Sequence, residues 1–185
     1  MPRFRRADSV SSTPTLRSER LLLTPYAPVD ENDFVALLRD EEVCKWMGQE
    51  RQPEETIRSL FGLLFTEVYP KNMFDVWAVR LDGRYVGHAE LKHTGNVDGH
   101  ELICALVRDV WHIGLGTELS NRVIDYGLDE LGLDAVHGCV NAANTRSLAM
   151  ALKAGFEIVR DVTGEDGKVT RVVTLRAADR QLLRK

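Results

Sequence analysis

Two glycines in the segment WHIGLGTEL, residues 111–119, are the first residues whose spacing suggests chemistry. Gly114 and Gly116 follow a strand-like run and precede a helix-like run. A phosphate can approach such a backbone closely because glycine has no Cβ, and the first N–H groups of a helix lack partners and point toward an anion. A tight turn that only starts a helix explains the same two glycines, so both interpretations stay open on this segment alone.

Two common nucleotide-binding motifs are excluded. A dinucleotide-binding GxGxxG motif requires glycine at position 119, where this chain has Leu119, and a βαβ unit around it. A P-loop requires Gly-Lys-Ser/Thr after a four-residue spacer, which the segment lacks.

A second segment, NAANTRSLAMALKAGFE at residues 141–157, carries amide and hydroxyl side chains. Asn141 ends a predicted strand, Asn144 begins a predicted helix and Ser147 follows one turn later. Together with free N–H donors, such side chains suit an anionic ligand rich in amides. For Asn144 the alternative is a plain helix N-cap.

Periodicity and turn residues predict the elements that position these groups. The strands are expected at residues 16–26, 73–81, 84–93, 100–109, 134–141, 156–162 and 168–177, and the helices at 31–40, 53–68, 114–131 and 144–155. The strands first follow one another and then alternate with helices. We therefore expect an α/β fold of the α+β type, with a mixed, mostly antiparallel sheet of six to seven strands flanked by about four helices. Residues 15–185 form one domain, and the basic, Ser/Thr-rich residues 1–14 are expected to be a disordered tail.

Composition narrows the possible functions. The formal net charge is −4 and there is no long basic run, which argues against a nucleic-acid partner. No apolar stretch approaches the length of a membrane span, so no membrane partner is expected. The three cysteines form no CxxC pair and the five histidines show no ligand spacing, so we expect no metal and a reducing, cytoplasmic location.

In this order and at this separation, the two segments resemble the GCN5-related N-acetyltransferase (GNAT) superfamily. The family's phosphate loop runs Gln/Arg-x-x-Gly-x-Gly/Ala, and Gly114 and Gly116 match it. Trp111 stands at the Gln/Arg position, which is typical of the branch that includes the ribosomal-protein N-terminal acetyltransferases. The segment at residues 16–48 also resembles the opening of that branch, so the resemblance covers about Leu16 to Ala177.

The resemblance implies a binding site for acetyl-coenzyme A in a wedge between the strands at residues 100–109 and 134–141. The pyrophosphate would lie on the loop that Trp111 begins, and the pantetheine arm would pair with the backbone and with amide side chains. The implied cofactor-binding residues are Leu106, Val107, Trp111, His112, Ile113, Gly114, Leu115, Gly116, Thr117, Asn141, Asn144 and Ser147.

The implied reaction is direct attack of a primary amine on the thioester carbonyl. Glu101 is the candidate general base, and an ordinary strand-end carboxylate is the alternative. Many family members have a tyrosine that protonates the thiolate at the position of Ala151, so in this chain that role is absent or falls to Ser147. A lysine amine, with a pKa of about 10.4, needs a base more than an α-amine with a pKa of about 8.

Acceptor recognition is expected from the first two helices and their loop, which carries Trp46 and Met47, and from the GEDG hairpin at residues 164–167. Glu90, which shares a strand face with His88, is a further candidate beside the acceptor site. A solvated sheet face is the alternative for that pair. The glutamates at positions 41, 42, 50, 54 and 55 make this side acidic, which would suit a cationic acceptor. A protein N-terminus is the leading acceptor. A small amine, polyamine or aminoglycoside, and a non-catalytic acyl-coenzyme A sensor, are the alternatives, and a homodimer is an open option.

Overall fold

The structure is a computed structural model that describes residues 13–183. Residues 1–12 of the predicted tail lie outside the described residues. Thr13 is buried, and the carbonyl of Pro14 accepts a hydrogen bond from the indole of Trp77 at 2.7 Å. The chain therefore already contacts the core at these two residues.

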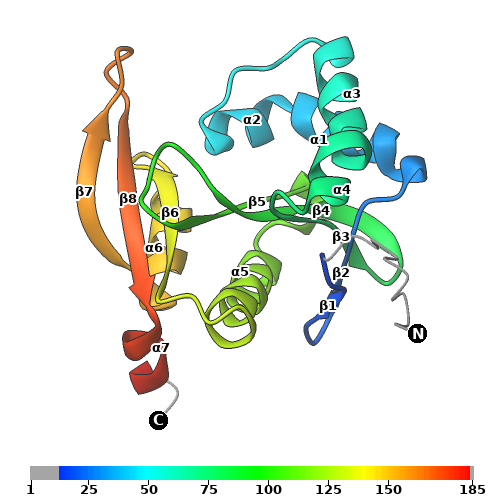
Figure 1. Cartoon of the computed structure of the whole chain (residues 1–185). Coiled ribbons are helices and arrows are strands. Elements are labelled where there is room, and N and C mark those ends of the chain that lie inside the picture. The colour runs from blue at the N-terminus through cyan, green and yellow to red at the C-terminus, as the bar shows by residue number, and fades with distance from the viewer. Residues whose placement is uncertain (1–12, 184–185) are drawn as a thin grey trace, which may run out of the picture.

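One sheet runs through the molecule (Figure 1), in the order β1-β2-β3-β4-β5-β6-β8-β7. All neighbouring strands are antiparallel except β5 and β6, which are parallel, so the predicted mixed, mostly antiparallel sheet is confirmed. The strands are β1 (Leu16–Arg17), β2 (Leu21–Thr24), β3 (Asp75–Leu81), β4 (Arg84–His93), β5 (His100–Leu106), β6 (Ala135–Asn141), β7 (Glu157–Thr163) and β8 (Val169–Arg176).

The strand count is eight in the described residues, against the six to seven expected. The difference arises at the first predicted strand, residues 16–26. The chain turns back at residues 18–20, so Leu16 pairs with Leu23 and one predicted strand becomes the hairpin of β1 and β2. Ser18 closes this turn, because its N–H donates to the carbonyl of Leu21 at 3.0 Å.

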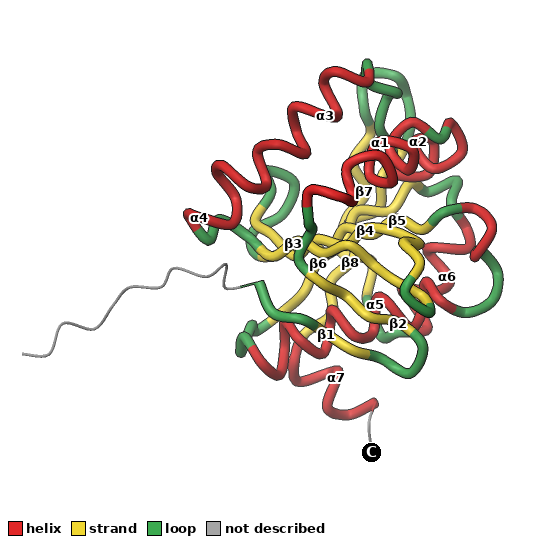
Figure 2. The backbone as a smooth tube through the Cα atoms, turned by 90° about the vertical axis from the view of Figure 1, so that its right-hand side faces the viewer, coloured by secondary structure: helices red, strands yellow, loops and turns green. Residues whose placement is uncertain are grey.

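Helices cover both faces of the sheet, as Figure 2 shows from the side. On one face lie α1 (Glu31–Arg39), α2 (Glu41–Met47), α3 (Glu54–Leu63) and α4 (Tyr69–Lys71), and on the other lie α5 (Leu115–Asp125) and α6 (Thr145–Lys153). A further helix, α7 (Ala177–Leu183), follows β8. The helical chain continues through π-helical turns at Leu64–Val68 after α3 and at Tyr126–Glu130 after α5.

Helix α2 corrects the prediction of a loop around Trp46 and Met47. The carboxylate of Asp40 accepts the N–H groups of Glu42 and Val43 at 3.0 and 3.2 Å, and so caps the start of the helix. Gly48 ends it with a φ of 69°, the left-handed conformation that glycine adopts freely. Seven residues are too few for a helical period to stand out in the sequence.

The sheet separates two hydrophobic cores. The core on the α5 face contains Trp77, Leu119 and Val123, and the core on the α1–α4 face contains Tyr26 and Phe61. The rings of Tyr26 and Phe61 meet edge to face at 5.6 Å. Both faces of the central strands are buried, which fixes their register.

Strands β5 and β6 separate soon after they meet. They share only two aligned pairs, His100 with Val136 and Glu101 with His137. Beyond them β5 stays with β4 up to Leu106, and β6 follows β8 as far as Asn141. The two halves of the sheet therefore diverge at Glu101 and leave a wedge between them.

Candidate active site

The glycine loop lies at the open end of this wedge, directly before α5. Gly114 is the N-cap of α5 and has a φ of 86°, which strains most other residues. The first helical bond runs from the N–H of Glu118 to the carbonyl of Gly114 at 3.2 Å. The N–H groups of Leu115, Gly116 and Thr117 precede that bond and have no carbonyl partner within the helix, so they are available to donate to an anion.

Arg20, in the turn between β1 and β2, binds both the glycine loop and Glu118 of α5. The carboxylate of Glu118 accepts the hydroxyl of Ser18 at 2.6 Å and both the N–H and the guanidinium of Arg20 at 2.7 Å. The same guanidinium donates to the carbonyl of Ile113 at 3.0 Å. The carbonyl of Ile113 thus points to Arg20, while its side chain is exposed.

The backbone N–H and C=O groups of β5 that do not pair with β4 point toward the wedge. The predicted contact of Val107 with a ligand is corrected, because both of its backbone groups are engaged. The N–H of Val107 donates to Val86 at 2.9 Å and its carbonyl accepts from Val110 at 3.3 Å, so neither group of Val107 is available to a ligand. Antiparallel pairing then alternates, and the polar groups of Cys104 and Leu106 point away from β4, toward the wedge. The indole of Trp111 donates to the carbonyl of Leu106 at 2.7 Å, which gives this tryptophan a structural role in the loop.

Helix α6 forms the opposite wall. The side-chain oxygen of Asn144 accepts the N–H of Ser147 at 3.1 Å, so Asn144 is the N-cap of α6. Asn141 closes the turn before it, with its side-chain oxygen on the N–H of Ala143 at 2.9 Å. In both amides the oxygen is engaged within the chain, and the NH₂ group is the one that can serve a ligand.

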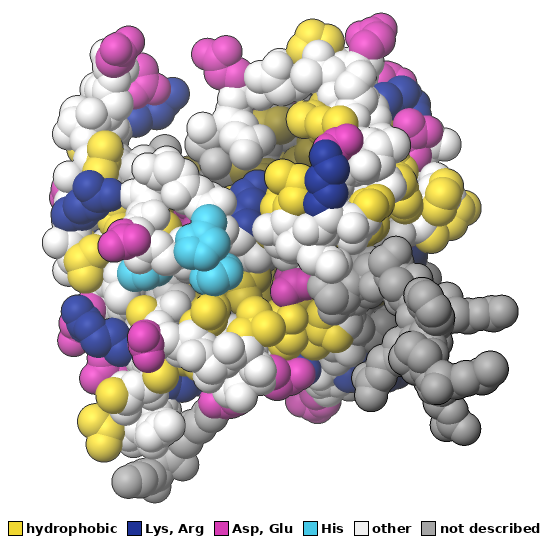
Figure 3. All heavy atoms as spheres, viewed as in Figure 1, with side chains coloured by type: hydrophobic (Ala, Val, Ile, Leu, Met, Phe, Trp, Pro, Cys, Tyr) yellow, Lys and Arg dark blue, Asp and Glu magenta, His cyan; other side chains and the backbone are white. Residues whose placement is uncertain are grey.

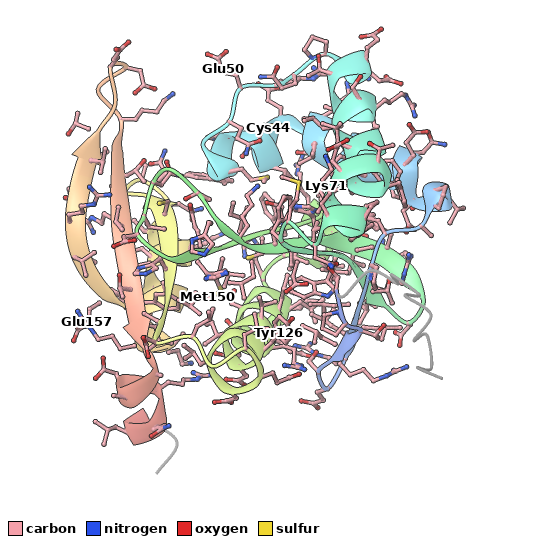
Figure 4. The ribbon with its side chains drawn as sticks, viewed as in Figure 1. Cys44, Glu50, Lys71, Tyr126, Met150 and Glu157 are labelled. Atoms are coloured by element: carbon pink, nitrogen blue, oxygen red, sulfur yellow. The ribbon has the colours of Figure 1, made fainter. Side chains whose placement is uncertain are left out.

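A cavity of about 1340 Å³ occupies the wedge and extends to α2 and the β7–β8 hairpin. The hollow is visible in Figure 3 between the hairpin and the helices. Met150 reaches from α6 toward α5 (Figure 4), and its sulfur would lie 3.5 Å from a Cβ on Gly116. Of the predicted residues, the cavity is lined by Trp46, Met47, Glu101, Leu106, Trp111, His112, Gly114, Gly116, Thr117, Asn141, Asn144 and Ser147.

Glu101 lies at the narrow end of the wedge and is 4% exposed. Its Oε2 accepts the hydroxyl of Thr94 at 2.6 Å and the side-chain amide of Asn96 at 3.1 Å. It shares a sheet face with His137, its aligned partner on β6. The carboxylate is therefore buried, hydrogen-bonded and in contact with the cavity, which is the arrangement expected of a functional acid or base.

Two cysteines line the same cavity. Burial raises the pKa of Cys104. Burial, together with the charge of Glu101 and a hydrogen bond to it, raises the pKa of Cys139 to about 12. Both thiols therefore stay protonated at neutral pH, where a thiolate nucleophile would have to be ionised.

Glu90 is a predicted acceptor residue that the structure places elsewhere. It does not line the cavity, and its Oε1 lies 3.1 Å from Nε2 of the buried His88 while Lys92 contacts its other oxygen at 2.5 Å. Burial alone would raise the pKa of Glu90, but the interactions with His88 and Lys92 outweigh it and bring the pKa to about 2. The predicted pairing of His88 and Glu90 is confirmed, and the pair lies on the face of β4 that α1 covers, where the ring of His88 contacts that of Phe34.

The predicted acidic surface also lies outside the cavity. None of the five glutamates lines it, and Glu50 points outward from the loop after α2 (Figure 4). Their helix-start positions explain Glu41, Glu54 and Glu55, since a helix N-terminus favours negative charge. Within the described residues, Glu101 is the single carboxylate of the cavity lining.

Several cavity residues were not predicted from the sequence, among them Asn96 in the β4–β5 loop, Arg160 on β7 and Arg146 on α6. Thr94, in the same loop as Asn96, does not line the cavity but donates to Glu101, and it was not predicted either. Arg146 lies 2.9 Å from Nε2 of His112 across the mouth of the wedge. No local motif marks these residues, because only the splayed sheet brings their segments to the wedge.

No group of three or more His, Cys, Asp or Glu side chains between residues 13 and 183 could hold a metal ion. Over the same range, no helix has the length and apolar character needed to cross a membrane.

The fold and the wedge define a class: a domain with a mixed, mostly antiparallel sheet in which two parallel strands splay apart beside a helix that begins at a glycine loop. The family model described as an acetyltransferase (GNAT) domain matches residues 20–157, which is more than half of the chain. The chain belongs to the GNAT acetyltransferases, and the predicted superfamily and enzyme class are confirmed.

Individual relatives agree with this assignment. An uncharacterized N-acetyltransferase, YoaA of Bacillus subtilis (strain 168), is 27% identical over 153 residues, which cover 78% of this chain and 83% of YoaA. An acetyltransferase (GNAT family) structure from Bacillus anthracis has a TM-score of 0.75 at 17% identity and covers 89% of this chain and 99% of its own. A spermidine N-acetyltransferase from Vibrio cholerae, solved with CoA and spermine, has a TM-score of 0.76 at 14% identity and covers 88% and 98%. At these identities the two structures show the shared fold.

Proposed function

We propose that this chain transfers the acetyl group of acetyl-coenzyme A to the α-amine of a protein or peptide N-terminus. The observation that carries the proposal is the wedge, with a glycine-lined anion site at its open end and the buried Glu101 at its narrow end. Acetyl-coenzyme A supplies the acetyl thioester when bound. The residues fit such a ligand, because the wedge offers unpaired N–H groups for phosphate and a strand edge for amides.

In this proposal the N–H groups of Leu115, Gly116 and Thr117 hold the diphosphate. The pantetheine arm runs along β5 beside Cys104 and the N–H of Leu106, and the NH₂ groups of Asn141 and Asn144 face it. This order leads from the open end of the wedge toward its apex at Glu101.

Glu101 is the proposed general base. It removes a proton from the acceptor amine, directly or through one water, as the amine attacks the thioester carbonyl. Ser147 is the proposed hydroxyl near the sulfur, since Ala151 occupies the tyrosine position. A thiolate with a pKa of about 8.5 needs little protonation to leave, so the missing tyrosine is compatible with turnover.

Direct attack is favoured over an acetyl-cysteine intermediate. The raised pKa values of Cys104 and Cys139 keep both cavity thiols protonated. The described cysteines are also free rather than paired. A reducing compartment such as the cytoplasm fits this state.

The charge of the cavity favours an acceptor with one amine. A polyamine carries several positive charges and would be matched by several carboxylates. Among the described lining residues there is one carboxylate, Glu101, and there are two guanidinium groups, those of Arg146 and Arg160. Trp46 and Met47 offer an apolar wall for the first side chain of a peptide. A polyamine is the second candidate, because one structural neighbour was solved with CoA and spermine.

A panel of acceptors tests the proposal. The protein is incubated with acetyl-coenzyme A and peptides, spermidine, spermine or an aminoglycoside, and the release of free coenzyme A thiol is followed. We expect release that depends on peptides with a free α-amine and stops when that amine is blocked. Release with polyamines alone would replace the proposed acceptor, and cofactor binding without release for any acceptor would indicate a non-catalytic sensor.

A further inference from the structure

The loop between β4 and β5 holds the carboxylate of Glu101 in a defined orientation. The hydroxyl of Thr94 and the side-chain amide of Asn96 both donate to Oε2, at 2.6 and 3.1 Å. The backbone N–H of Asn96 donates to the hydroxyl oxygen of Thr94 at 3.2 Å. That oxygen is thus occupied as an acceptor, and its one proton is directed to Glu101. Both loop donors therefore engage Oε2, and Oε1 is left to face other partners.

The loop is itself tied to the far side of the wedge. The guanidinium of Arg160, on β7, donates to the carbonyl of Asn96 at 2.5 Å. At the end of the loop, Gly99 has a φ of 135°, and a Cβ there would lie 2.8 Å from Nε2 of His137 on β6. Only glycine combines this conformation with this close approach. The loop therefore contacts β6 and β7 while it holds a residue of β5.

We propose that Thr94 and Asn96, with the loop fixed by Arg160, are positioning residues that turn Oε1 of Glu101 toward the acceptor amine. This inference rests on the proposed role of Glu101 as the base. The amine N–H proton passes to Oε1, directly or through one water, while the new N–C bond forms and the C–S bond breaks. The electron pair of that bond leaves with the coenzyme A thiolate, and the proton on Oε1 then passes to water or to that thiolate.

The test compares Thr94→Val, which removes the hydroxyl and keeps the shape, with Thr94→Ser, which keeps the hydroxyl. For Thr94→Val we expect kcat to fall about 10-fold. The KM for acetyl-coenzyme A should stay within about twofold, because Thr94 does not touch the glycine loop. Thr94→Ser should restore kcat, a rescue that a purely structural role of the methyl group would not give.

Glu101→Gln separates this inference from the proposed base. If Glu101→Gln loses turnover while Thr94→Val keeps the wild-type kcat, the positioning role is wrong and the base role stands. If Glu101→Gln turns over at the wild-type rate, the base role fails and the inference fails with it. Asn96→Ala gives the same kinetic readout at an exposed residue should Thr94→Val not fold, and an unchanged kcat there would also overturn the inference.

Discussion

Glu101 combines three properties that its position in the sequence does not reveal. It is buried, it accepts two hydrogen bonds from one loop, and it lies where β5 and β6 part. The sequence offered a carboxylate ten residues before Trp111 and left an ordinary strand-end residue as the alternative. Burial at the apex of the wedge makes a solvated strand end the poorer description.

A substitution of this residue tests its proposed role. Glu101→Gln keeps the size and removes the base, so kcat should fall by about 100-fold, a typical contribution of general-base catalysis. Acetyl-coenzyme A affinity should change little, because the anion site lies at the other end of the wedge. Steady-state kinetics with a peptide acceptor and a separate binding titration measure the two effects. Unchanged turnover would remove Glu101 as the base.

Gly114 allows a test of the anion site with a matched control. Gly114→Asp places a negative charge at the N-cap of α5, where it should repel a diphosphate. Gly114→Asn is the neutral control, because both side chains meet the same backbone strain at a φ of 86°. We expect the two variants to lose similar thermal stability, Gly114→Asp to lose acetyl-coenzyme A binding, and Gly114→Asn to bind more tightly than Gly114→Asp. Equal affinities of the two variants would contradict an anion site at this residue.

At the scale of single residues, motif spacing predicted most of the residues that line the cavity. It did not predict which backbone and side-chain groups are already engaged within the chain. Gly114, Asn141 and Ser147 line the cavity as their spacing suggested. Val107 does not serve the wedge, because its N–H donates to Val86 on β4 and its carbonyl accepts from Val110 in the next turn. Glu90 lies on the α1 side of β4, where His88 and Lys92 bind its carboxylate.

Among the elements, the β1–β2 hairpin and α5 are joined through Glu118. Its carboxylate accepts the hydroxyl of Ser18 and two donors of Arg20. Burial would raise the pKa of Glu118, but the hydrogen bonds from Ser18 and Arg20 outweigh it and lower the pKa below its ordinary value of 4.5. This link holds the first hairpin against the helix whose N-terminus forms the anion site.

The lowered pKa predicts a pH-dependent contribution to stability. A carboxyl group with a depressed folded-state pKa stabilises the fold above its unfolded pKa, and this stability is lost as the pH falls through the folded value. Glu118→Gln should therefore lower the free energy of unfolding by about 1 kcal/mol at pH 7, a modest figure because Arg20 is partly exposed. The difference from wild type should shrink as the pH falls below about 4.5.

Urea denaturation at pH 7 and at pH values below 4.5 measures this difference. Glu130→Gln is the control: it breaks the ion pair with Arg122, in which half of the Glu130 side chain is exposed, and should change stability little. A Glu118→Gln deficit that stays constant with pH would contradict the assignment of the stabilisation to the ionised carboxylate.

Most elements followed from periodicity and turn residues, and the failures share a cause. Helix α2 has seven residues and lies between Asp40 and Gly48, both of which are cap residues that could have revealed it. The first predicted strand is a hairpin because Ser18 closes a turn. The segment LRSERLLL contains no glycine, proline, asparagine or aspartate that would predict this turn. Short elements leave too few residues for a period to be read.

At the scale of the whole molecule, periodicity and turn residues predicted the mixed sheet, whereas the wedge was expected only from the family resemblance. The order of strands and helices is a local property of the chain. The separation of β5 from β6 after two aligned pairs depends on the choice of β8 as the partner of β6. That choice also brings β7 and its Arg160 to the cavity, which is why the acceptor side could not be read from any one segment.

The most direct test of the central claim uses a peptide that carries both a free N-terminal α-amine and an internal lysine. The protein is incubated with acetyl-coenzyme A and this peptide, and mass spectrometric fragmentation locates the added acetyl group. The account predicts one acetyl group on the α-amine, formed by the wild-type protein and strongly reduced in Gly114→Asp and Glu101→Gln. Binding of acetyl-coenzyme A without acetylation of either amine, or acetylation of the lysine alone, would contradict it.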